Sequence, residues 1–282
     1  MYEVAVFRLT VDLECHEDPP SHAYLKTIHQ LLDRLDEQRV RATFFVNGTA
    51  LASESGRQSV KEISIRGHEI GSHGHEHVFI RSLEPNQFRK DLIRSKDELL
   101  EITGKLPLGY RAPYFSLTSE VPWVPELIET CGFKYSSSVF PARNPQAGYP
   151  SAPKIPFRWQ GTSLIEFPVP IFGVGSFGLP LLGGGYFRLL PNSLVPLLRR
   201  VKLNRGDTWT YLHPYDLSPK IPAYAAESLP NVFRPLISVR RKNSIDRYLR
   251  LVSEESSTLG DLASSMELFR GLTDWRHPRE GL

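Results

Sequence analysis

The 282-residue sequence contains few sulfur-bearing residues, with two cysteines and two methionines. Two cysteines cannot provide the multiple disulfides on which small secreted domains depend. The spacing of Cys15 and Cys131 matches no zinc-binding motif. Free thiols are typical of reducing compartments, so we expect both cysteines to be unpaired.

Long apolar segments are also missing. Residues 1–10 include Glu3 and Arg8 and have no long apolar core, so they do not resemble a signal peptide. The longest uncharged run, residues 167–187, is interrupted by Pro168, Pro170 and Pro180, which disfavour a membrane-spanning helix. These observations favour a soluble, cytoplasmic protein.

Strong charge is absent as well, because the formal net charge is only +3. The densest basic clusters, residues 199–202 and 240–242, are too short to predict nucleic-acid binding, and we expect solvated helix faces or loops there. A mildly basic surface also suits an anionic, phosphate-bearing substrate or a membrane surface.

Strand-like and helix-like patterns alternate along the first half of the chain, which predicts parallel strands covered by outer helices. Apolar and β-branched runs predict the strands, and apolar side chains at helical spacing predict the helices. We expect strands at 4–11, 42–46, 69–72, 108–111 and 207–212, and helices at 21–38, 57–66, 84–103, 122–131 and, as one or two helices, within 244–269.

The length and the hydrophobic content of 40% suit one large domain spanning residues 1–282. Residues 141–191 are rich in proline and glycine and predict a loop-rich insertion with short strands. We expect residues 274–282 to be loosely ordered.

Residues 68–77 hold four of the nine histidines in the protein. On a helix or a helical turn, His73 and His77 would lie on one face and could share a metal ion. Gly71 and Ser72 just before them are typical of a turn or a helix N-cap. Two histidines alone could also belong to a surface loop, so a catalytic site needs a further ligand, often a carboxylate.

The carboxylate candidates follow the first predicted strand. Asp12 and Glu14 are two residues apart, so in an extended chain both side chains point to the same side. Arg111 and His213 lie at or just after later predicted strands. Because the carboxyl ends of barrel strands converge at one rim, these residues and the two histidines can meet there.

The chain contains four motif-like segments, at residues 10–14, 73–77, 111–114 and 211–213. In this order, they resemble the motifs of the polysaccharide deacetylase family, the NodB-homology or carbohydrate esterase family 4 group. The resemblance implies a distorted (β/α) barrel of about seven parallel strands. Further segments at 166–169, 183–188 and 213–215 resemble a subgroup tied to bacterial surface-polysaccharide gene clusters. The four matching segments are residues 10–14 (T-F-D-D-G in the family), 73–77 (H-[ST]-x-x-H), 111–114 (R-x-P-Y) and 211–213 (L-H).

The resemblance also implies a divalent metal, usually zinc, with His73 and His77 as ligands. It implies a role for each of four further residues in amide hydrolysis. These are Asp12 as the catalytic base, His213 as the general acid, Arg111 as the residue that orients Asp12 and holds its charge, and the backbone N–H of Tyr114 as a donor to the oxyanion.

The sequence departs from the family pattern at two positions. Leu13 stands where the family has a second aspartate that binds the metal, so we assign this ligand role to Glu14. Ser136 stands where relatives often have an aspartate that orients the acid histidine, and Glu166 or Asp216 is a candidate to replace it.

Three residues near the motifs keep alternative roles. His75 is a further ligand, a substrate contact or a bystander of the motif. Tyr186 and Arg188 follow three glycines and are candidates for substrate contact, or else parts of a tight turn with a buried aromatic.

The leading hypothesis is a metal-dependent hydrolase of linear amides that removes N-acetyl or N-formyl from an amino sugar. The substrate would be a nucleotide- or lipid-linked precursor, or a polysaccharide, in bacterial surface-polysaccharide biosynthesis. A lipid-linked sugar would bring the protein to the inner face of the membrane. The alternatives are an allantoinase-like hydrolase of small amides and a degenerate sugar-binding module, which Leu13 and Ser136 favour. The sequence does not predict the sugar or the oligomeric state.

Overall fold

The structure is a computed structural model that describes residues 6–15, 22–198, 207–218, 239, 243–252, 256–268 and 271–276. Both basic clusters that the sequence singles out, 199–202 and 240–242, lie outside these residues, as do residues 277–282. Cys15 and Cys131 are free thiols, as predicted, and both are buried. No described helix is long and apolar enough to span a bilayer.

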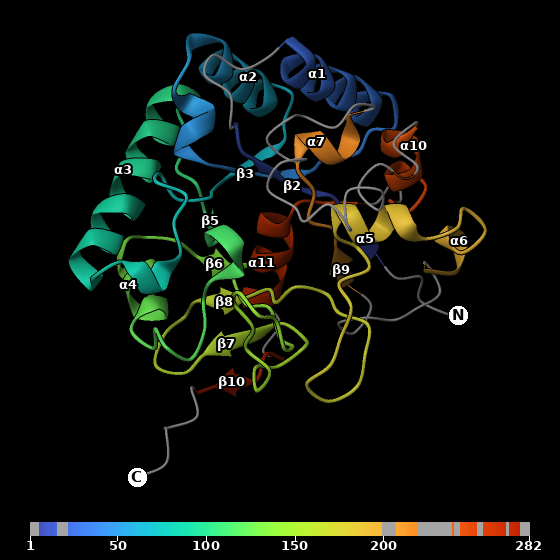
Figure 1. Cartoon of the computed structure of the whole chain (residues 1–282). Helices are drawn as coiled ribbons and strands as arrows, with labels where there is room; N and C mark the ends of the chain where they lie inside the picture. Colours follow the sequence, from blue (N-terminus) through green and yellow to red (C-terminus); the bar gives the residue numbers. More distant parts are fainter. Residues whose placement is uncertain are drawn as a thin grey trace.

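Parallel strands form the centre of the molecule (Figure 1). Strands β1 (Val6–Arg8) and β2 (Thr10–Leu13) follow each other directly, β1 pairing with β9 (Asp207–Trp209) and β2 with β3 (Thr43–Val46). The parallel sheet then continues through β4 (Glu69–Ser72), β5 (Gly109–Tyr110), β6 (Tyr135–Ser136) and β8 (Ile165–Glu166).

With β1 and β2 counted as one strand, these are the seven parallel strands predicted for the distorted barrel, and the predicted α/β fold is confirmed. Among the described residues no strand pairing joins β8 to β9. The rings of Phe167 and Trp209 pack across this gap with their centroids 5.4 Å apart. Side-chain packing therefore takes the place of a ladder at the seam.

The region 141–191 adds short strands beside the barrel. Strand β7 (Phe157–Trp159) pairs antiparallel with β8, and β10 (Asp274–Trp275) pairs with β7. The expectation of loose order was therefore wrong at residues 274–275, because Trp275 packs its ring against Phe157 and Trp159. Helix α5 (Gly184–Leu189) lies near the end of this region, and α6 (Val195–Leu198) follows it.

The longer helices lie outside the sheet, and their ends follow from local sequence. Helices α1 (His22–Glu37), α2 (Glu54–Ile65), α3 (Pro85–Thr103) and α4 (Val124–Thr130) agree with the predicted segments to within three residues. The Ser53 hydroxyl accepts a hydrogen bond from the Gly56 N–H at the start of α2. Gly104, with a φ of 68°, ends α3 in the left-handed conformation, as glycine does at many helix ends.

Helix α11 (Leu259–Leu268) closes the end of the barrel at which the strands begin. Leu259 and Leu262 pack against Phe45 and Trp209. The Glu69 carboxylate, at the start of β4, accepts hydrogen bonds from the Gly260 N–H at 2.9 Å and the Tyr135 hydroxyl at 2.8 Å. Helix α11 therefore covers the beginnings of these strands, and in barrels of this kind the chemistry is found at the opposite, carboxyl end. Helices α7 (Pro214–Leu217) and α10 (Ser244–Leu249) complete the described elements.

Candidate metal and catalytic site

The alternation of side chains along β2 separates the core residues from the site residues. Val11 and Leu13 are buried in the largest apolar cluster, while Asp12 and Glu14 point to the opposite side. Leu13 therefore cannot reach the place of a metal ligand. Glu14 is buried too, with only 6% of its surface exposed, and it carries the carboxylate in place of the family's second aspartate.

Glu14, His73 and His77 come together as the sequence predicts for the metal site. Glu14 Oε1 lies 2.9 Å from His73 Nε2 and 2.7 Å from His77 Nε2. One ligand atom from each residue lies within 4.8 Å of the other two. Two imidazoles and one carboxylate form the protein donor set found in catalytic zinc sites, which leave a coordination position open. These residues thus fit a divalent metal.

The orientation of His73 supports this fit. Its Nδ1 lies 2.8 Å from the carbonyl oxygen of Arg111, which can only accept a hydrogen bond. A neutral His73 ring therefore carries its proton on Nδ1 and presents the lone pair of Nε2 towards Glu14. Metal-binding histidines are commonly held in this way by a carbonyl or a carboxylate.

The expected helical turn between His73 and His77 is wrong, because residues 73–79 form an irregular loop. Gly74 and His77 have φ angles of 72° and 48°, which no helix contains. The Asn47 side chain holds the loop by donating to the carbonyl oxygens of His73 and Gly74, both at 3.1 Å. Gly71 and Ser72 end strand β4, which confirms the strand predicted at residues 69–72 and not the turn or N-cap expected of these two residues.

Asp12 and Arg111 form the predicted ion pair. Arg111 is fully buried, and its Nη1 donates to Asp12 Oδ1 at 2.6 Å and to the Thr10 hydroxyl at 2.9 Å. Its Nη2 donates to the Ser137 hydroxyl at 3.0 Å, and the guanidinium lies over the Phe45 ring at 4.1 Å. A buried carboxylate held by such a planar donor has a fixed position and a compensated charge.

His213 follows Leu212, which pairs in parallel with Val11 of β2, and it faces the Glu14 carboxylate at the same end of the strands. Its Nε2 lies 3.6 Å from Glu14 Oε1, and its Nδ1 lies 3.3 Å from Asp216 Oδ2. Burial lowers the pKa of His213, but the Glu14 and Asp216 carboxylates outweigh burial and raise the pKa well above its ordinary value. The ring stacks on Tyr215 with the centroids 4.7 Å apart.

Tyr114 and Tyr186 are both partly exposed. Tyr114 has a φ of 59°, and 43% of its surface is exposed. Its ring stacks on Phe79, with the centroids 4.2 Å apart, and lies 4.8 Å from the His77 ring. Tyr186, in α5, is 44% exposed, and its predicted substrate contact stays a prediction. Sequence reasoning missed Phe79, which only its place two residues after His77 could have indicated.

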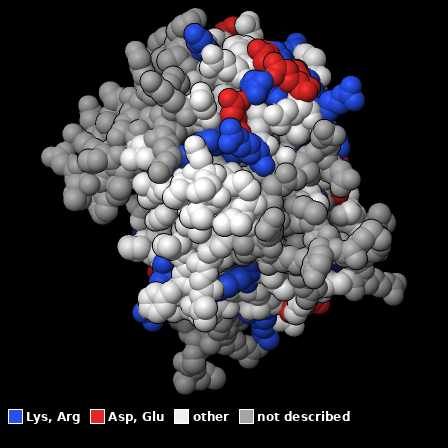
Figure 2. Space-filling model, turned by 90° about the vertical axis from the view of Figure 1, so that its right-hand side faces the viewer, with Lys and Arg blue, Asp and Glu red and all other residues white. Residues whose placement is uncertain are grey.

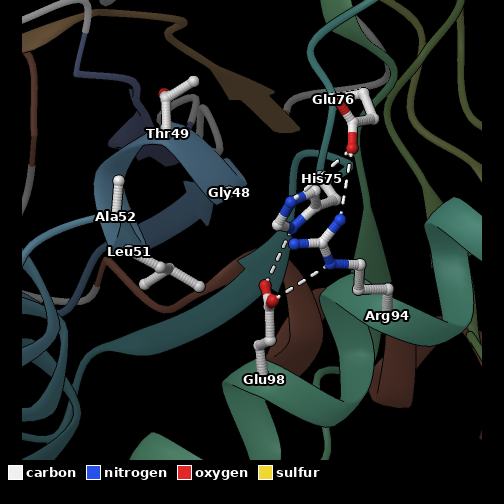
Figure 3. A pocket seen from close by; sticks show the side chains of 8 residues that line it. All are labelled: Gly48, Thr49, Leu51, Ala52, His75, Glu76, Arg94 and Glu98. Atoms are coloured by element: carbon white, nitrogen blue, oxygen red, sulfur yellow. Dashed lines mark hydrogen bonds and ion pairs between the residues drawn. The ribbon is translucent and has the colours of Figure 1, made fainter.

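His75 lies outside the ligand group. Its Nδ1 lies 2.8 Å from Glu98 Oε2, and its ring packs against Gly48, where no side chain would fit. Figure 3 shows the ring beside Glu98 and Arg94 of α3, in a pocket of about 370 Å³ that also includes Thr49. Of the roles left open for His75, that of a metal ligand is therefore excluded by this geometry.

The substrate contact expected of Arg188 is wrong. Arg188 is only 2% exposed and forms an ion pair with Asp216, which is equally buried. Of the two carboxylates proposed to orient His213, Asp216 makes the contact. Glu166 instead accepts hydrogen bonds from the N–H groups of Ser138 and Val139.

The comparisons with known proteins agree with this geometry. Residues 17–135 match the model of the family described as polysaccharide deacetylase, and residues 137–258 match that of a domain of unknown function, DUF3473. A peptidoglycan deacetylase of Helicobacter pylori is 31% identical over 40% of this chain and 36% of its own. A peptidoglycan-N-acetylglucosamine deacetylase of Bacillus cereus is 31% identical over 34% of this chain and 35% of its own. The match thus spans about a third of the length of these curated relatives.

Solved structures share the fold over nearly the whole chain. A structure from Mycobacterium smegmatis, titled as a polysaccharide deacetylase, covers 98% of this chain and 94% of its own, with a TM-score of 0.64 and 23% identity. The chitin deacetylase of Colletotrichum lindemuthianum covers 92% of this chain and 88% of its own, with a TM-score of 0.50 and 17% identity.

Proposed function

We propose that the chain is a metal-dependent hydrolase of the polysaccharide deacetylase type, which removes the N-acetyl group from an amino sugar. The match of residues 17–135 to that family and the deacetylases among the relatives support this proposal. Relatives named for deacetylation of peptidoglycan N-acetylglucosamine and of chitin support acetyl, rather than formyl, as the leaving acyl group. N-acetylglucosamine is common to both of those polymers, so a β-linked N-acetylglucosamine chain is the first substrate to test.

The observation that carries the proposal is the position of Glu14. Its Oε1 lies within 2.9 Å of the Nε2 atoms of His73 and His77, although Leu13 occupies the family's usual ligand position. A sugar-binding module without turnover has no need of this metal donor set, in which a buried carboxylate lies between two histidine nitrogens.

Glu14, His73 and His77 would hold a divalent metal, with zinc the leading candidate. When bound, such an ion would polarise the amide carbonyl and lower the pKa of a water molecule to about 7. The remaining work falls to residues of the chain that already have fixed positions.

Hydrolysis requires a proton acceptor and a proton donor on either side of the amide. Asp12, fixed by Arg111, accepts a proton from the attacking water as the oxygen bonds to the carbonyl carbon. The backbone N–H of Tyr114 is the proposed donor to the oxygen that becomes anionic. His213 then gives a proton from Nε2 to the amine nitrogen as the carbon–nitrogen bond breaks, and acetate and the free amino sugar leave.

The proposal extends to surface-polysaccharide biosynthesis in bacteria, with a lipid-linked precursor as the alternative to a finished polymer. The side of the molecule that carries α5 and α6 presents a broad area without charged side chains (Figure 2). Leu189, Leu194 and Leu197 are exposed in this part of the chain, and the basic sequence 199–202 follows directly. Apolar and basic residues together suit a peripheral position at the inner face of an anionic membrane.

The experiment is a product assay on the purified protein with chitin oligosaccharides, peptidoglycan fragments and an N-formyl amino sugar. We expect one acetate for each new amine and no activity in His73→Ala. His75→Ala is the matched control in the same loop, and we expect it to retain activity if the His75–Glu98 pair only supports the loop. Turnover of formyl substrate alone would overturn the assignment of the acyl group, and metal binding with no product from any amino sugar would favour the sugar-binding module.

A further inference from the structure

We propose that the ion pair between Arg188 and Asp216 positions His213 in this chain, and thereby takes over the task of the family aspartate that Ser136 replaces. This inference rests on the proposed function, because it concerns the proton donor of the same reaction. It assigns a role to the glycine-rich segment 183–188. It also assigns one to the region 137–258, whose family is described only as a domain of unknown function.

The two oxygens of Asp216 serve different partners. Oδ2 accepts hydrogen bonds from the backbone N–H of His213 at 3.0 Å and from its Nδ1 at 3.3 Å. Oδ1 pairs with Nη1 of Arg188, which also donates to the Asp216 carbonyl oxygen at 3.3 Å. With Nδ1 held by a carboxylate, the Nε2 of His213 points to the metal site, where a transferable proton is needed.

Arg188 stabilises the buried carboxylate of Asp216. A carboxylate that is 2% exposed loses most of its hydration, and its ionised form then requires a nearby cation. Arg188 is equally buried and pairs with Oδ1 of Asp216, whereas His213 contacts Oδ2. Arg188 therefore compensates the charge of Asp216, and no group that contacts the substrate is needed for this.

The glycines before Arg188 provide the room. A Cβ atom on Gly184 would lie 1.9 Å from Asp216 Oδ2, and one on Gly183 would lie 2.1 Å from the Tyr211 ring. The Gly184 carbonyl oxygen in turn accepts a hydrogen bond from the Tyr248 hydroxyl at 3.3 Å. Any other residue at position 184 would displace the Asp216 carboxylate, so the glycine-rich segment provides the space that Asp216 occupies.

Ser136, which stands at the position of the family aspartate, cannot provide the negative charge that Asp216 provides. Ser136 Oγ donates to Ser138 Oγ at 2.8 Å and is fully buried, so it stabilises the neighbouring loop. Strand β9, which precedes His213, pairs with β1 at the other end of the sequence. The region of unknown function therefore supplies strand β9 and the proposed acid together with its positioning pair.

A purely structural role is the competing explanation, because Asp216 also caps the start of α7. Asp216→Asn, Arg188→Met and Arg188→Lys separate the two roles. Asp207→Asn is the control, since it breaks another arginine–aspartate pair, the part-buried pair of Arg8 and Asp207 on β9, without touching His213. The readouts are kcat and KM on chitin oligosaccharides, metal content, thermal unfolding and the ¹⁵N signals of the His213 ring.

We expect Asp216→Asn to lower kcat about 10- to 100-fold, within the contribution of a general acid, with KM and metal content unchanged. Arg188→Met should lower kcat similarly, and Arg188→Lys should restore part of it. In the wild type, the ¹⁵N spectrum should show Nδ1 of His213 protonated and hydrogen-bonded, and Asp216→Asn should change that signal.

Several results would overturn the inference. These are an Asp216→Asn variant with the kcat of Asp207→Asn, a loss confined to KM or to metal content, or an unchanged ¹⁵N spectrum. If the wild type itself released no acetate, the proposed function would fail, while the ¹⁵N comparison would still decide whether Asp216 holds the ring. Should Arg188→Met not fold, Arg188→Lys and Asp216→Asn carry the test.

Discussion

Replacement of Arg111 by methionine tests how the carboxylate of Asp12, the proposed catalytic base, is held. The variant keeps a side chain of similar length but removes the cation and the donors to Asp12, Thr10 and Ser137. Asp12 is 2% exposed and would remain in the interior with no positive partner. The charge, rather than the lost packing, should therefore dominate the effect.

The size of the effect follows from burial. Breaking a buried ion pair by removing one partner costs about 3–5 kcal/mol, because the other charge is left uncompensated. In the Arg111→Met background, Asp12→Asn removes that charge and should recover part of the loss. The two substitutions should therefore be coupled by about 1–3 kcal/mol.

Urea unfolding followed by tryptophan fluorescence measures these free energies, since the chain has four tryptophans. Arg57→Met is the matched control, because Arg57 pairs with Glu101 at 2.9 Å on the surface, where the carboxylate is 70% exposed. That substitution should cost less than about 1 kcal/mol. An Arg111→Met variant no less stable than Arg57→Met, or strictly additive effects of the Arg111 and Asp12 substitutions, would refute the reasoning.

Three further predictions concern other residues of the site and its surroundings. Burial lowers the pKa of His68 to about 4, so between pH 4 and 6.5 the unfolded chain binds more protons than the folded chain, and the free energy of unfolding decreases as the pH is lowered. Denaturant unfolding at pH 7 and at pH 5 should show that His68→Gln removes about 2 kcal/mol of this decrease. Leu13→Asp restores the family residue but buries a charge in the core cluster, so it should cost more than about 3 kcal/mol without tightening metal binding. Tyr114→Ala keeps the backbone N–H and loses an exposed ring, so steady-state kinetics should show KM raised about 3- to 10-fold with kcat largely retained.

The parts of the fold that depend on local sequence could be predicted. The period-two alternation of β2 correctly placed Asp12 and Glu14 on one side, because it needs only an extended backbone. Helix α3 ends where predicted, since Gly104 adopts a conformation that other residues disfavour. The seven parallel strands followed from the resemblance and from the alternation of strands and helices.

The parts that depend on distant partners could not be predicted. The prediction of a helical turn between His73 and His77 was wrong, because the side chain of Asn47, at the end of another strand, holds that loop in an irregular conformation. Arg188 was mistaken for a substrate contact because its partner, Asp216, lies 28 residues further on. The contact between Asp216 and His213 could have been predicted, because their spacing is that of an N-cap residue and the third residue of the helix.

Zinc titration of the wild type, Glu14→Gln and His75→Ala, followed by calorimetry, tests the central claim most directly. If Glu14 replaces the usual aspartate as ligand, as we propose, one zinc ion per chain should bind to the wild type and to His75→Ala, and Glu14→Gln should lose at least about 10-fold in affinity. Equal affinity in all three proteins, or no binding by the wild type, would contradict the account.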